Sequence, residues 1–273
     1  MISTPETQAA SPAPISVLLS VHNGAKTLDR CLESIAYQTL PDIHIICIDD
    51  ASTDDSKNIL ENWQKKFGEH MTILRNDKNL GLTLSLNRGI DAVTTPFIAR
   101  IDADDWWEPT KLEKQAAFLA THSEYGVVGT NYVNHTPMQE KKITLPETDG
   151  EIKKIIFWHN PFAHSAVMYR TDVICEAGKY NPSVPYAQDY ELWVRCFAQT
   201  KFHNLQEFLC HRTLGEGISV DKQNEQMRQY LKVLRTYLPL YHRPLRDYGA
   251  MVEPILVLMT PEWIKKLKRS YFP

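Results

Sequence analysis

Short apolar runs alternate with amphipathic helical patterns through the first half of the chain. The runs occupy residues 15–20, 43–48, 71–74 and 97–101. Nearly continuous apolar runs of this length are typical of strands that are covered on both faces. Between the first two runs, apolar residues recur with helical spacing from Leu28 to Ile35. Because strands that alternate with helices form parallel sheets with right-handed crossovers, the sequence predicts an α/β fold.

Polar and acidic side chains follow three of these runs. They occupy residues 21–24 (VHNG), 49–52 (DDAS) and 102–105 (DADD). Asp102 and Asp104 are two residues apart, so they share a face in a strand and can converge on one metal in a turn. Their mutual repulsion is costly unless a cation or a donor network offsets it. Taken alone, the cluster fits equally well an acidic turn before a helix that begins near Pro109.

The three polar segments are expected at one edge of the sheet, where open parallel sheets bind their ligands. The sequence contains neither GxGxxG nor GxxxxGK[ST], so it lacks the usual backbone cradles for phosphate. A phosphate ligand at this edge would therefore need a cation that bridges it to the carboxylates.

Composition narrows the class of protein. The chain has 273 residues, of which 43% are hydrophobic and 23% charged, as in soluble globular proteins. A net charge of −3 gives no reason to expect a nucleic acid partner. Five cysteines without a CxxC pair favour a reduced, cytoplasmic chain. Residues 1–14 are predicted to be a disordered leader, and no apolar run approaches the roughly 20 residues that span a bilayer.

The second half of the chain is less regular. Strands are predicted over 126–132 and 166–169, with a polar connection over 139–150. Two further helices are expected, one that begins near Asp189 and one over 231–238 that Pro239 stops.

Six short motifs, in this order, resemble those of the inverting family-2 glycosyltransferases, which have a GT-A fold. They read SVHN at 20–23, IDDASTD at 48–54, NLGL at 79–82, DAD at 102–104, NPFAH at 160–164 and QDYELW at 188–193. The resemblance implies a Rossmann-like mixed, mostly parallel sheet flanked by helices. It also implies a GT-A domain over 15–220, with a nucleotide-binding half (15–105) and an acceptor-binding half (106–220), and a helical extension over 221–273.

Carried over position by position, the resemblance implies a nucleotide-sugar site. The residues that it assigns to the donor are Val21, Asn23, Asp50, Asn79, Gly81, Asp102, Ala103 and Asp104. Asp50 would accept a hydrogen bond from the ring N–H of the base, which favours uridine; helix capping is the alternative for Asp49 and Asp50. Asp104 would bind Mn²⁺ or Mg²⁺, with Asp102 on the ribose or near the metal. The cation would neutralise the leaving nucleoside diphosphate.

The resemblance implies that Asp189 is the general base, which takes the proton from the acceptor hydroxyl as its oxygen attacks the anomeric carbon. Attack opposite the leaving group inverts the configuration. An N-cap is the alternative role for Asp189. Trp106, His164 and Gln188 are implied on the acceptor side. The alternatives are that Trp106 or Trp107 packs beneath the acidic loop and that His164 is a structural histidine.

Two departures from the family pattern bear on the chemistry. Gln188 stands where members often have Glu, which removes a like charge beside Asp189 and leaves its pKa less elevated. When residues 217–219 are aligned, Leu214 stands where a metal-binding His is expected, and His211 is the candidate replacement. Both departures favour the alternative of a non-catalytic sugar-nucleotide-binding protein, whereas Asp189 and the intact acidic motif favour an enzyme.

The expected reaction is transfer of a sugar from a nucleotide sugar, with UDP favoured, to a saccharide or lipid-linked saccharide in bacterial polysaccharide synthesis. Residues 262–273 are basic and aromatic, which suits contact with the inner face of the plasma membrane. A solvated helix packed on the body is the alternative for this segment. The donor sugar and the linkage cannot be read from the sequence.

Overall fold

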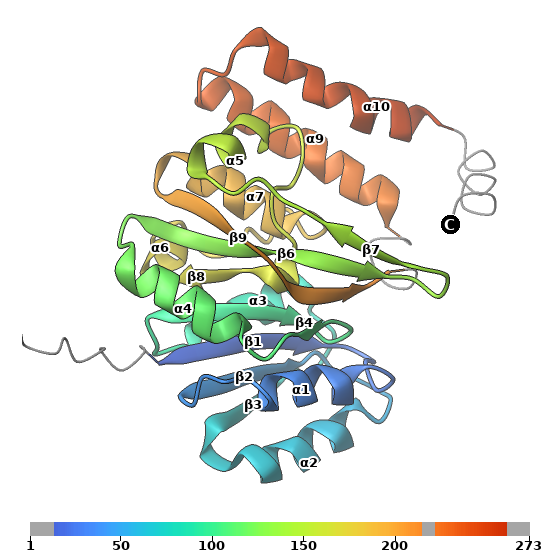
Figure 1. Ribbon diagram of the computed structural model, residues 1–273. Coiled ribbons are helices and arrows are strands. Elements are labelled where there is room, and N and C mark those ends of the chain that lie inside the picture. The colour runs from blue at the N-terminus through green and yellow to red at the C-terminus, as the bar shows by residue number, and fades with distance from the viewer. Residues whose placement is uncertain (1–13, 215–221, 261–273) are drawn as a thin grey trace, which may run out of the picture.

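The computed structural model describes residues 14–214 and 222–260. Within these ranges nine strands form one sheet, in the order β3-β2-β1-β4-β8-β6-β9-β5, and β7 pairs with β6 (Figure 1). The predicted leader (1–14) lies outside the described residues except for its last residue. The aligned segment 217–219 and the predicted membrane segment 262–273 also lie outside them.

The first half forms the predicted parallel part of the sheet. Its strands are β1 (Ile15–Val21), β2 (Ile43–Asp49), β3 (Met71–Arg75) and β4 (Phe97–Asp102). Its helices are α1 (Leu28–Ala36), α2 (Ser56–Phe67) and α3 (Leu82–Asp91), with the short turn η1 (Gly68–His70). β2, β1 and β4 are parallel neighbours, so Val21, Asp49 and Asp102 end their strands at one edge, as predicted.

The second half makes the sheet mixed. Its strands are β5 (Trp106–Trp107), β6 (Tyr125–His135), β7 (Glu140–Ile143), β8 (Met168–Arg170) and β9 (Lys201–Thr213). Its helices are α4 (Lys111–Thr121), α5 (Asp149–Ile155), α6 (Thr171–Glu176) and α7 (Gln188–Arg195), with the turns η2 (His164–Ala166) and η3 (Cys196–Ala198). β8 runs antiparallel to both β4 and β6, and it joins the two parts.

Three details differ from the sequence prediction. β9 was not expected, because its register against β6 shifts between Leu205 and Cys210, and this breaks the regular alternation that marks a strand. The predicted connection over 139–150 contains β7 and the start of α5. Pro239 does not stop its helix but lies inside the last turn of α9 (Gln223–Leu240), where a missing N–H donor costs a single hydrogen bond.

Two apolar layers cover the two faces of the sheet. Leu18 of β1 packs in one layer with Leu86 of α3, whereas its neighbour Leu19 packs in the other with Leu28 of α1, because successive side chains of a strand point to opposite faces. The first layer also takes in Leu234 of α9. This helix is therefore part of the main body.

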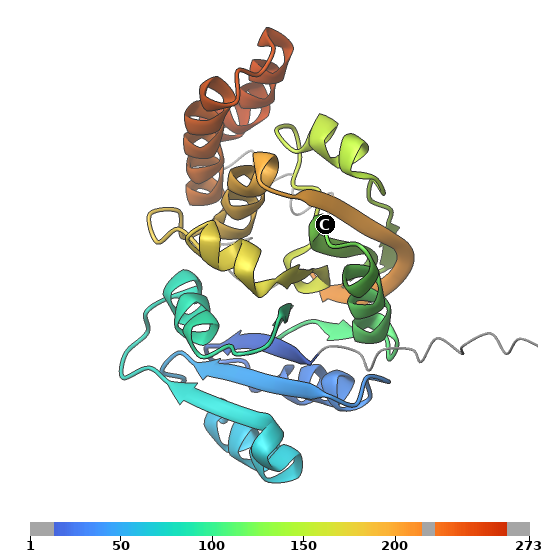
Figure 2. The ribbon, with the colours of Figure 1, turned by 90° about the vertical axis from the view of Figure 1, so that its left-hand side faces the viewer.

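The chain continues through η4 (Leu245–Met251) to α10 (Val252–Met259). In both views these elements lie at the end of the molecule opposite β3 and α2 (Figures 1 and 2). Among the described residues, none of the helices combines the length and the apolar character that crossing a bilayer requires. The predicted division into halves and an extension stays a prediction.

Candidate active site

Asn23 ties the loop after β1 to the loop after β2. Its backbone lies in the left-handed region (φ 55°), which Asn tolerates better than most residues. The Oδ1 atom accepts hydrogen bonds from the backbone N–H groups of Thr53 (2.7 Å) and Asp54 (3.3 Å). The backbone N–H of Asn23 donates to Ser52 Oγ at 3.1 Å. The structure thus gives Asn23 a positioning role, and its contact with a nucleotide stays a prediction.

Asp50 holds the loop that precedes α3. Its carboxylate is buried and accepts hydrogen bonds from the backbone N–H groups of Leu80 (2.8 Å) and Gly81 (2.9 Å) and from Asn76 Nδ2 (2.7 Å). Asn79 Oδ1 also accepts from the N–H of Gly81, at 3.0 Å. The predicted donor residues Asp50, Asn79 and Gly81 therefore form one unit. Neither Asp49 nor Asp50 lies at a helix N-cap, since the N-cap residue of α2 is Asp55.

The loop after β1 also touches the acidic loop. A side chain at Gly24 would come within 2.7 Å of Val21 and 3.5 Å of Ala103. Glycine is favoured at this position because a Cβ atom would clash with the side chain of Val21, whereas its distance to Ala103 would be an ordinary contact.

Asp102 is paired with an arginine inside the protein. Arg100, fully buried on β4, contacts both carboxylate oxygens of Asp102 through its two terminal nitrogens. Ser165 Oγ donates to Asp102 Oδ2 at 3.1 Å and accepts from the Asp102 N–H at 3.0 Å. Burial opposes ionisation of Asp102, but the Arg100 guanidinium outweighs it and holds the pKa of this carboxyl well below its usual range.

The pKa values of Asp104 and Asp105 are raised, in contrast to that of Asp102. Burial and the negative charge of Asp102 raise the pKa of Asp104 to about 6. Burial and the charges of Asp102 and Asp104 raise the pKa of Asp105 to about 7. One oxygen of each of the three carboxylates lies within 4.8 Å of the others, and Asp105 is 3% exposed. A hard divalent cation fits this donor set, because it binds oxygen ligands and offsets the repulsion between them.

Two side chains from distant elements fix the acidic loop. The carbonyl oxygen of Asp104 accepts hydrogen bonds from Arg30 of α1 (3.0 Å) and from Thr213 Oγ1 at the end of β9 (2.7 Å). The backbone N–H of Thr213 donates to Asp105 Oδ1 at 3.0 Å. The loop is thus held from both sides, which presets the positions of its carboxylates.

His211 is not part of the group formed by Asp102, Asp104 and Asp105, and its role as a metal ligand stays a prediction. Its Nδ1 lies 2.9 Å from His135 Nε2, and its Nε2 lies 2.8 Å from Glu108 Oε1. Both ring nitrogens are therefore occupied. The ring stacks on Trp106 with centroids 5.0 Å apart, because β5 and β9 pair Trp106 with His211.

Trp106 is also covered by Arg30, whose guanidinium carbon lies 3.7 Å from the centroid of the ring. A sugar that stacks on Trp106 would have to share the ring with these neighbours, so the acceptor role stays a prediction.

Trp107 packs beneath the acidic loop, which is one of the alternatives given in the sequence analysis. It is 3% exposed, and its Nε1 donates to the carbonyl of Ser165 at 2.7 Å.

His164 is a buried residue beside the acidic cluster. Its Nε2 lies 2.7 Å from the Tyr180 hydroxyl. Burial and the nearby Arg100 guanidinium lower its pKa well below the usual value, so the ring is neutral at physiological pH. This environment matches the structural alternative for His164 and leaves contact with an acceptor as a prediction.

Asp189 lies in the first turn of α7 and is not its N-cap, which is Ala187. Its Oδ2 accepts a hydrogen bond from Asn160 Nδ2 at 2.8 Å. Burial raises the pKa of Asp189, and the bond from Asn160 and the positive charges of Arg100 and Arg212 reduce that rise. Gln188, the preceding residue, is 7% exposed.

The same two arginines also act on the cluster formed by Asp102, Asp104 and Asp105. Arg100 and Arg212 lower the pKa of Asp104 as they do that of Asp189. Arg212 Nε also lies 4.0 Å from Asp105 Oδ2. The segment 160–165 also links the two regions, because Asn160 donates to Asp189 and Ser165 donates to Asp102.

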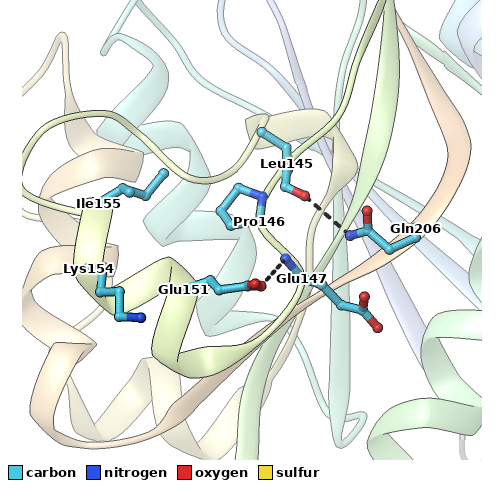
Figure 3. A pocket seen from close by; sticks show the side chains of 7 residues that line it. All are labelled: Leu145, Pro146, Glu147, Glu151, Lys154, Ile155 and Gln206. Carbon is cyan, nitrogen blue, oxygen red and sulfur yellow. Dashed lines mark hydrogen bonds between the residues drawn. The ribbon is translucent and has the colours of Figure 1, made fainter.

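A surface pocket of about 430 Å³ lies elsewhere. Figure 3 shows its lining, formed by Leu145, Pro146, Glu147, Glu151, Lys154, Ile155 and Gln206. Glu151 accepts from the Glu147 N–H at 3.2 Å and Gln206 donates to the Leu145 carbonyl at 3.2 Å, so two of its polar side chains bond to the chain itself. No residue of this lining is among those that the sequence analysis assigns to a site.

Sequence reasoning missed Arg100, Asp105, Ser165 and Arg212. Arg100 left a signal, because a charged residue inside the apolar run of β4 must find a buried partner. Asp105 was in the acidic motif, but its burial depends on β9, which was not predicted. Ser165 and Arg212 join the cluster through the tertiary fold, and the sequence carries no local sign of this.

The chain matches the family model described as Glycosyl transferase family 2 over residues 16–174. It therefore belongs to this family, and its fold is GT-A. It is an enzyme that transfers glycosyl groups from nucleotide sugars.

Among curated relatives, it is 33% identical over 184 residues to the amylovoran biosynthesis glycosyltransferase AmsE of Erwinia amylovora, covering 66% of this chain and 68% of AmsE. It is 28% identical over 256 residues to the putative glycosyltransferase EpsE of Bacillus subtilis, covering 90% of each chain.

Two solved structures share the fold. TarS 1–349 of S. aureus in complex with UDP-GlcNAc matches with a TM-score of 0.68 and 19% identity, over 89% of this chain and 71% of that one. The mannosyltransferase PcManGT of Pyrobaculum calidifontis, in complex with GDP-Man and Mn²⁺, matches with a TM-score of 0.66 and 15% identity, over 93% and 73%.

Proposed function

We propose that this glycosyltransferase is an inverting, divalent-metal-dependent enzyme that uses a UDP-sugar and a saccharide acceptor in the synthesis of a bacterial surface polysaccharide. The observation that carries this proposal is that one short segment, residues 160–165, contacts both the proposed base and the acidic cluster: Asn160 donates to Asp189 at 2.8 Å and Ser165 donates to Asp102 at 3.1 Å. The relative named for amylovoran biosynthesis supports the polysaccharide, and the TarS complex with UDP-GlcNAc supports UDP. The PcManGT complex supports Mn²⁺ but holds GDP-Man, so the base needs a test of its own.

In this proposal Asp104 and Asp105 hold the cation, and Asp102 stays ionised beside them because Arg100 compensates its charge. When bound, the cation neutralises charge on the departing nucleoside diphosphate. Arg212, which faces Asp105, adds positive charge on the same side. These residues stabilise the leaving group as the glycosidic bond breaks.

Asp189 takes the proton from the acceptor hydroxyl while the acceptor oxygen attacks the anomeric carbon. The raised pKa makes Asp189 a stronger base than an exposed aspartate. Asn160 holds one carboxylate oxygen in place and so orients the base. Displacement on the face opposite the leaving group gives the inverted product.

The test is the variant Asp189→Asn, which keeps the shape of the side chain and removes its basicity. We expect transfer from UDP-GlcNAc to fall by at least about 10³-fold, while the affinity for UDP in the presence of Mn²⁺ stays within about twofold. Asp42→Asn, at an exposed position, is the matched control. Turnover like that of the wild type in Asp189→Asn would refute the general-base role.

A further inference from the structure

Glu191 is a buried carboxylate on α7 that the proposed mechanism does not use. It is 1% exposed. Arg195, one turn further along the helix, contacts Glu191 Oε1 through Nε (3.1 Å) and Oε2 through Nη2 (2.9 Å). The hydroxyl of Tyr237 on α9 donates to Oε1 at 2.6 Å, and the amide of Asn181 lies 3.4 Å from the same oxygen. A buried charge is costly unless such partners satisfy it, so these contacts hold Glu191 in one place.

Tyr237 makes its contact as a neutral phenol. Burial, the hydrogen bond to Glu191 and the charge of Glu191 all raise the pKa of Tyr237. The hydroxyl therefore keeps its proton at physiological pH and is the donor to the carboxylate. A length of 2.6 Å is typical of a hydrogen bond from a hydroxyl to a charged acceptor, which is stronger than one between neutral groups.

Glu191 and the proposed base Asp189 lie on opposite sides of α7. Two residues along an α-helix correspond to a rotation of about 200°. Glu191 faces α9, which packs against α7 (Figure 1), whereas Asp189 bonds to Asn160 in the segment before η2. Since α7 has only eight residues, it cannot turn about its axis without moving both side chains. A bond that fixes Glu191 therefore also fixes the direction of Asp189.

We propose that Tyr237 is a positioning residue for sugar transfer, which sets the direction of Asp189 by holding Glu191. This inference rests on the proposed role of Asp189 as the general base. Tyr237 lies beyond residues 15–220, the predicted GT-A domain, so α9 contributes to the reaction without belonging to that domain. A displacement of about 1 Å at a reacting group can cost about 10²-fold in rate, so the loss of one hydroxyl is measurable.

The test compares Tyr237→Phe with Tyr241→Phe. The Tyr241 hydroxyl donates to the backbone carbonyl of Arg195 at 2.9 Å, so each change removes one bond to α7 from the same end of α9, but only the first removes a bond to Glu191. The readout is UDP release from UDP-GlcNAc in the presence of Mn²⁺. We expect Tyr237→Phe to lower kcat at least about fivefold with KM within about twofold, because Asp189 acts in the chemical step. Tyr241→Phe should leave both within about twofold.

The same substitution in Asp189→Asn shows whether Tyr237 acts through the base. With no base left to orient, Tyr237→Phe should change the residual rate by less than about twofold. Equal falls in the two backgrounds would overturn the proposal, as would equal falls in Tyr237→Phe and Tyr241→Phe. Wild-type kcat in Tyr237→Phe, with activity lost in Asp189→Asn, would overturn the role of Tyr237 alone. Wild-type turnover in Asp189→Asn would overturn the general base and this proposal together.

A second readout needs no donor sugar. Carbon-13 NMR of labelled aspartate carboxyl groups follows the titration of Asp189, whose signal is identified by its loss in Asp189→Asn. Burial raises the pKa of Asp189, and a helix that turns more freely lets water reach the carboxylate. We therefore expect this pKa to fall by at least about 0.5 in Tyr237→Phe and by less than about 0.2 in Tyr241→Phe. An unchanged pKa in Tyr237→Phe would contradict the positioning role, whichever nucleotide sugar is the donor.

Discussion

The buried Arg100 organises the acidic loop at the level of single residues. A guanidinium without access to solvent must be compensated, and here both oxygens of Asp102 do so. The pair has a consequence for the neighbouring acids: it fixes one negative charge in the cluster, and this charge raises the pKa of Asp104 and of Asp105. The negative charge of Asp102 thus repels those of Asp104 and Asp105. A cation that binds the loop would offset this repulsion.

Replacing Arg100 by Met should leave the Asp102 carboxylate without its partner. We expect the free energy of unfolding to fall by about 3 kcal/mol, at the low end for a buried pair because a third of the Asp102 side chain reaches solvent. Arg100→Lys keeps the charge but loses the two-point contact, so its loss should be smaller. Urea unfolding measures both, and a loss below about 1 kcal/mol in Arg100→Met would contradict the role of the pair.

Binding of Mn²⁺ should depend on pH through Asp104 and Asp105. Both pKa values are raised in the folded protein, to about 6 and about 7, so the folded state binds more protons than the unfolded chain above about pH 4. The stability from these two groups is thus present at low pH and is lost as pH rises through these values. A cation that displaces the protons binds better as pH rises.

Calorimetric titration of Mn²⁺ at pH 5, 6 and 7.5 checks this expectation. The affinity should rise by at least about tenfold across the series, and Asp189→Asn should show the same trend because Asp189 is not a ligand. An affinity that is constant over this range would mean that Asp104 and Asp105 do not hold the metal.

At the level of elements, Asn87 joins α3 to the loop before α7. Its Nδ2 donates to the carbonyl of Tyr180 at 2.8 Å, and its Oδ1 accepts from the N–H of Tyr180 at 2.9 Å. The Tyr180 hydroxyl in turn contacts His164. A helix of the parallel part thus positions a tyrosine beside the acidic cluster.

Asn87→Ala removes both bonds and leaves two backbone groups without partners. We expect a loss of about 2 kcal/mol in the free energy of unfolding, measured by urea denaturation. Asn58→Ala is a suitable control, because the Asn58 amide bonds to the exposed Asp55 side chain. Equal, small effects in the two variants would show that the link to Tyr180 carries no stability.

The parallel part of the fold was predictable, since each of its strands is an apolar run and each helix has a regular period. The predicted strand β1, for example, differs from the observed one at a single residue, Val21. β9 escaped prediction because its alternation is broken where it shifts register against β6. The acids of the site were visible as a motif. Their partner Ser165 was not, because it lies 63 residues from Asp102 in the sequence. Their pKa values were not, because burial by the tertiary fold is the largest cause of their shifts.

The whole molecule places its candidate site between the parallel part and the mixed part of one sheet. Binding of a ligand there contacts both parts and should stabilise the entire chain. In a thermal-shift series, UDP with Mn²⁺ at about 100 times its dissociation constant adds about 2.7 kcal/mol. For a chain of this size this corresponds to a rise of about 5–10 °C in melting temperature.

GDP with Mn²⁺ is the matched comparison, and UDP without metal is the second control. The UDP assignment predicts a larger shift for UDP than for GDP, and metal dependence predicts that most of the shift disappears when the cation is omitted. A larger shift with GDP than with UDP would contradict the assignment of UDP as the nucleotide of the donor. A shift of the same size without the cation would contradict the proposed metal dependence.

The contact between Arg100 of β4 and Ser165 of η2 sets a condition on chimeric enzymes. A designer who wants new acceptor specificity would naturally join residues 15–105 of one relative to the distal part of another. The junction between Asp105 and Trp106 separates Ser165 from both Arg100 and Asp102, to which it is hydrogen-bonded. Recombinants will therefore keep their activity when the parent that supplies the distal part has a hydroxyl at position 165.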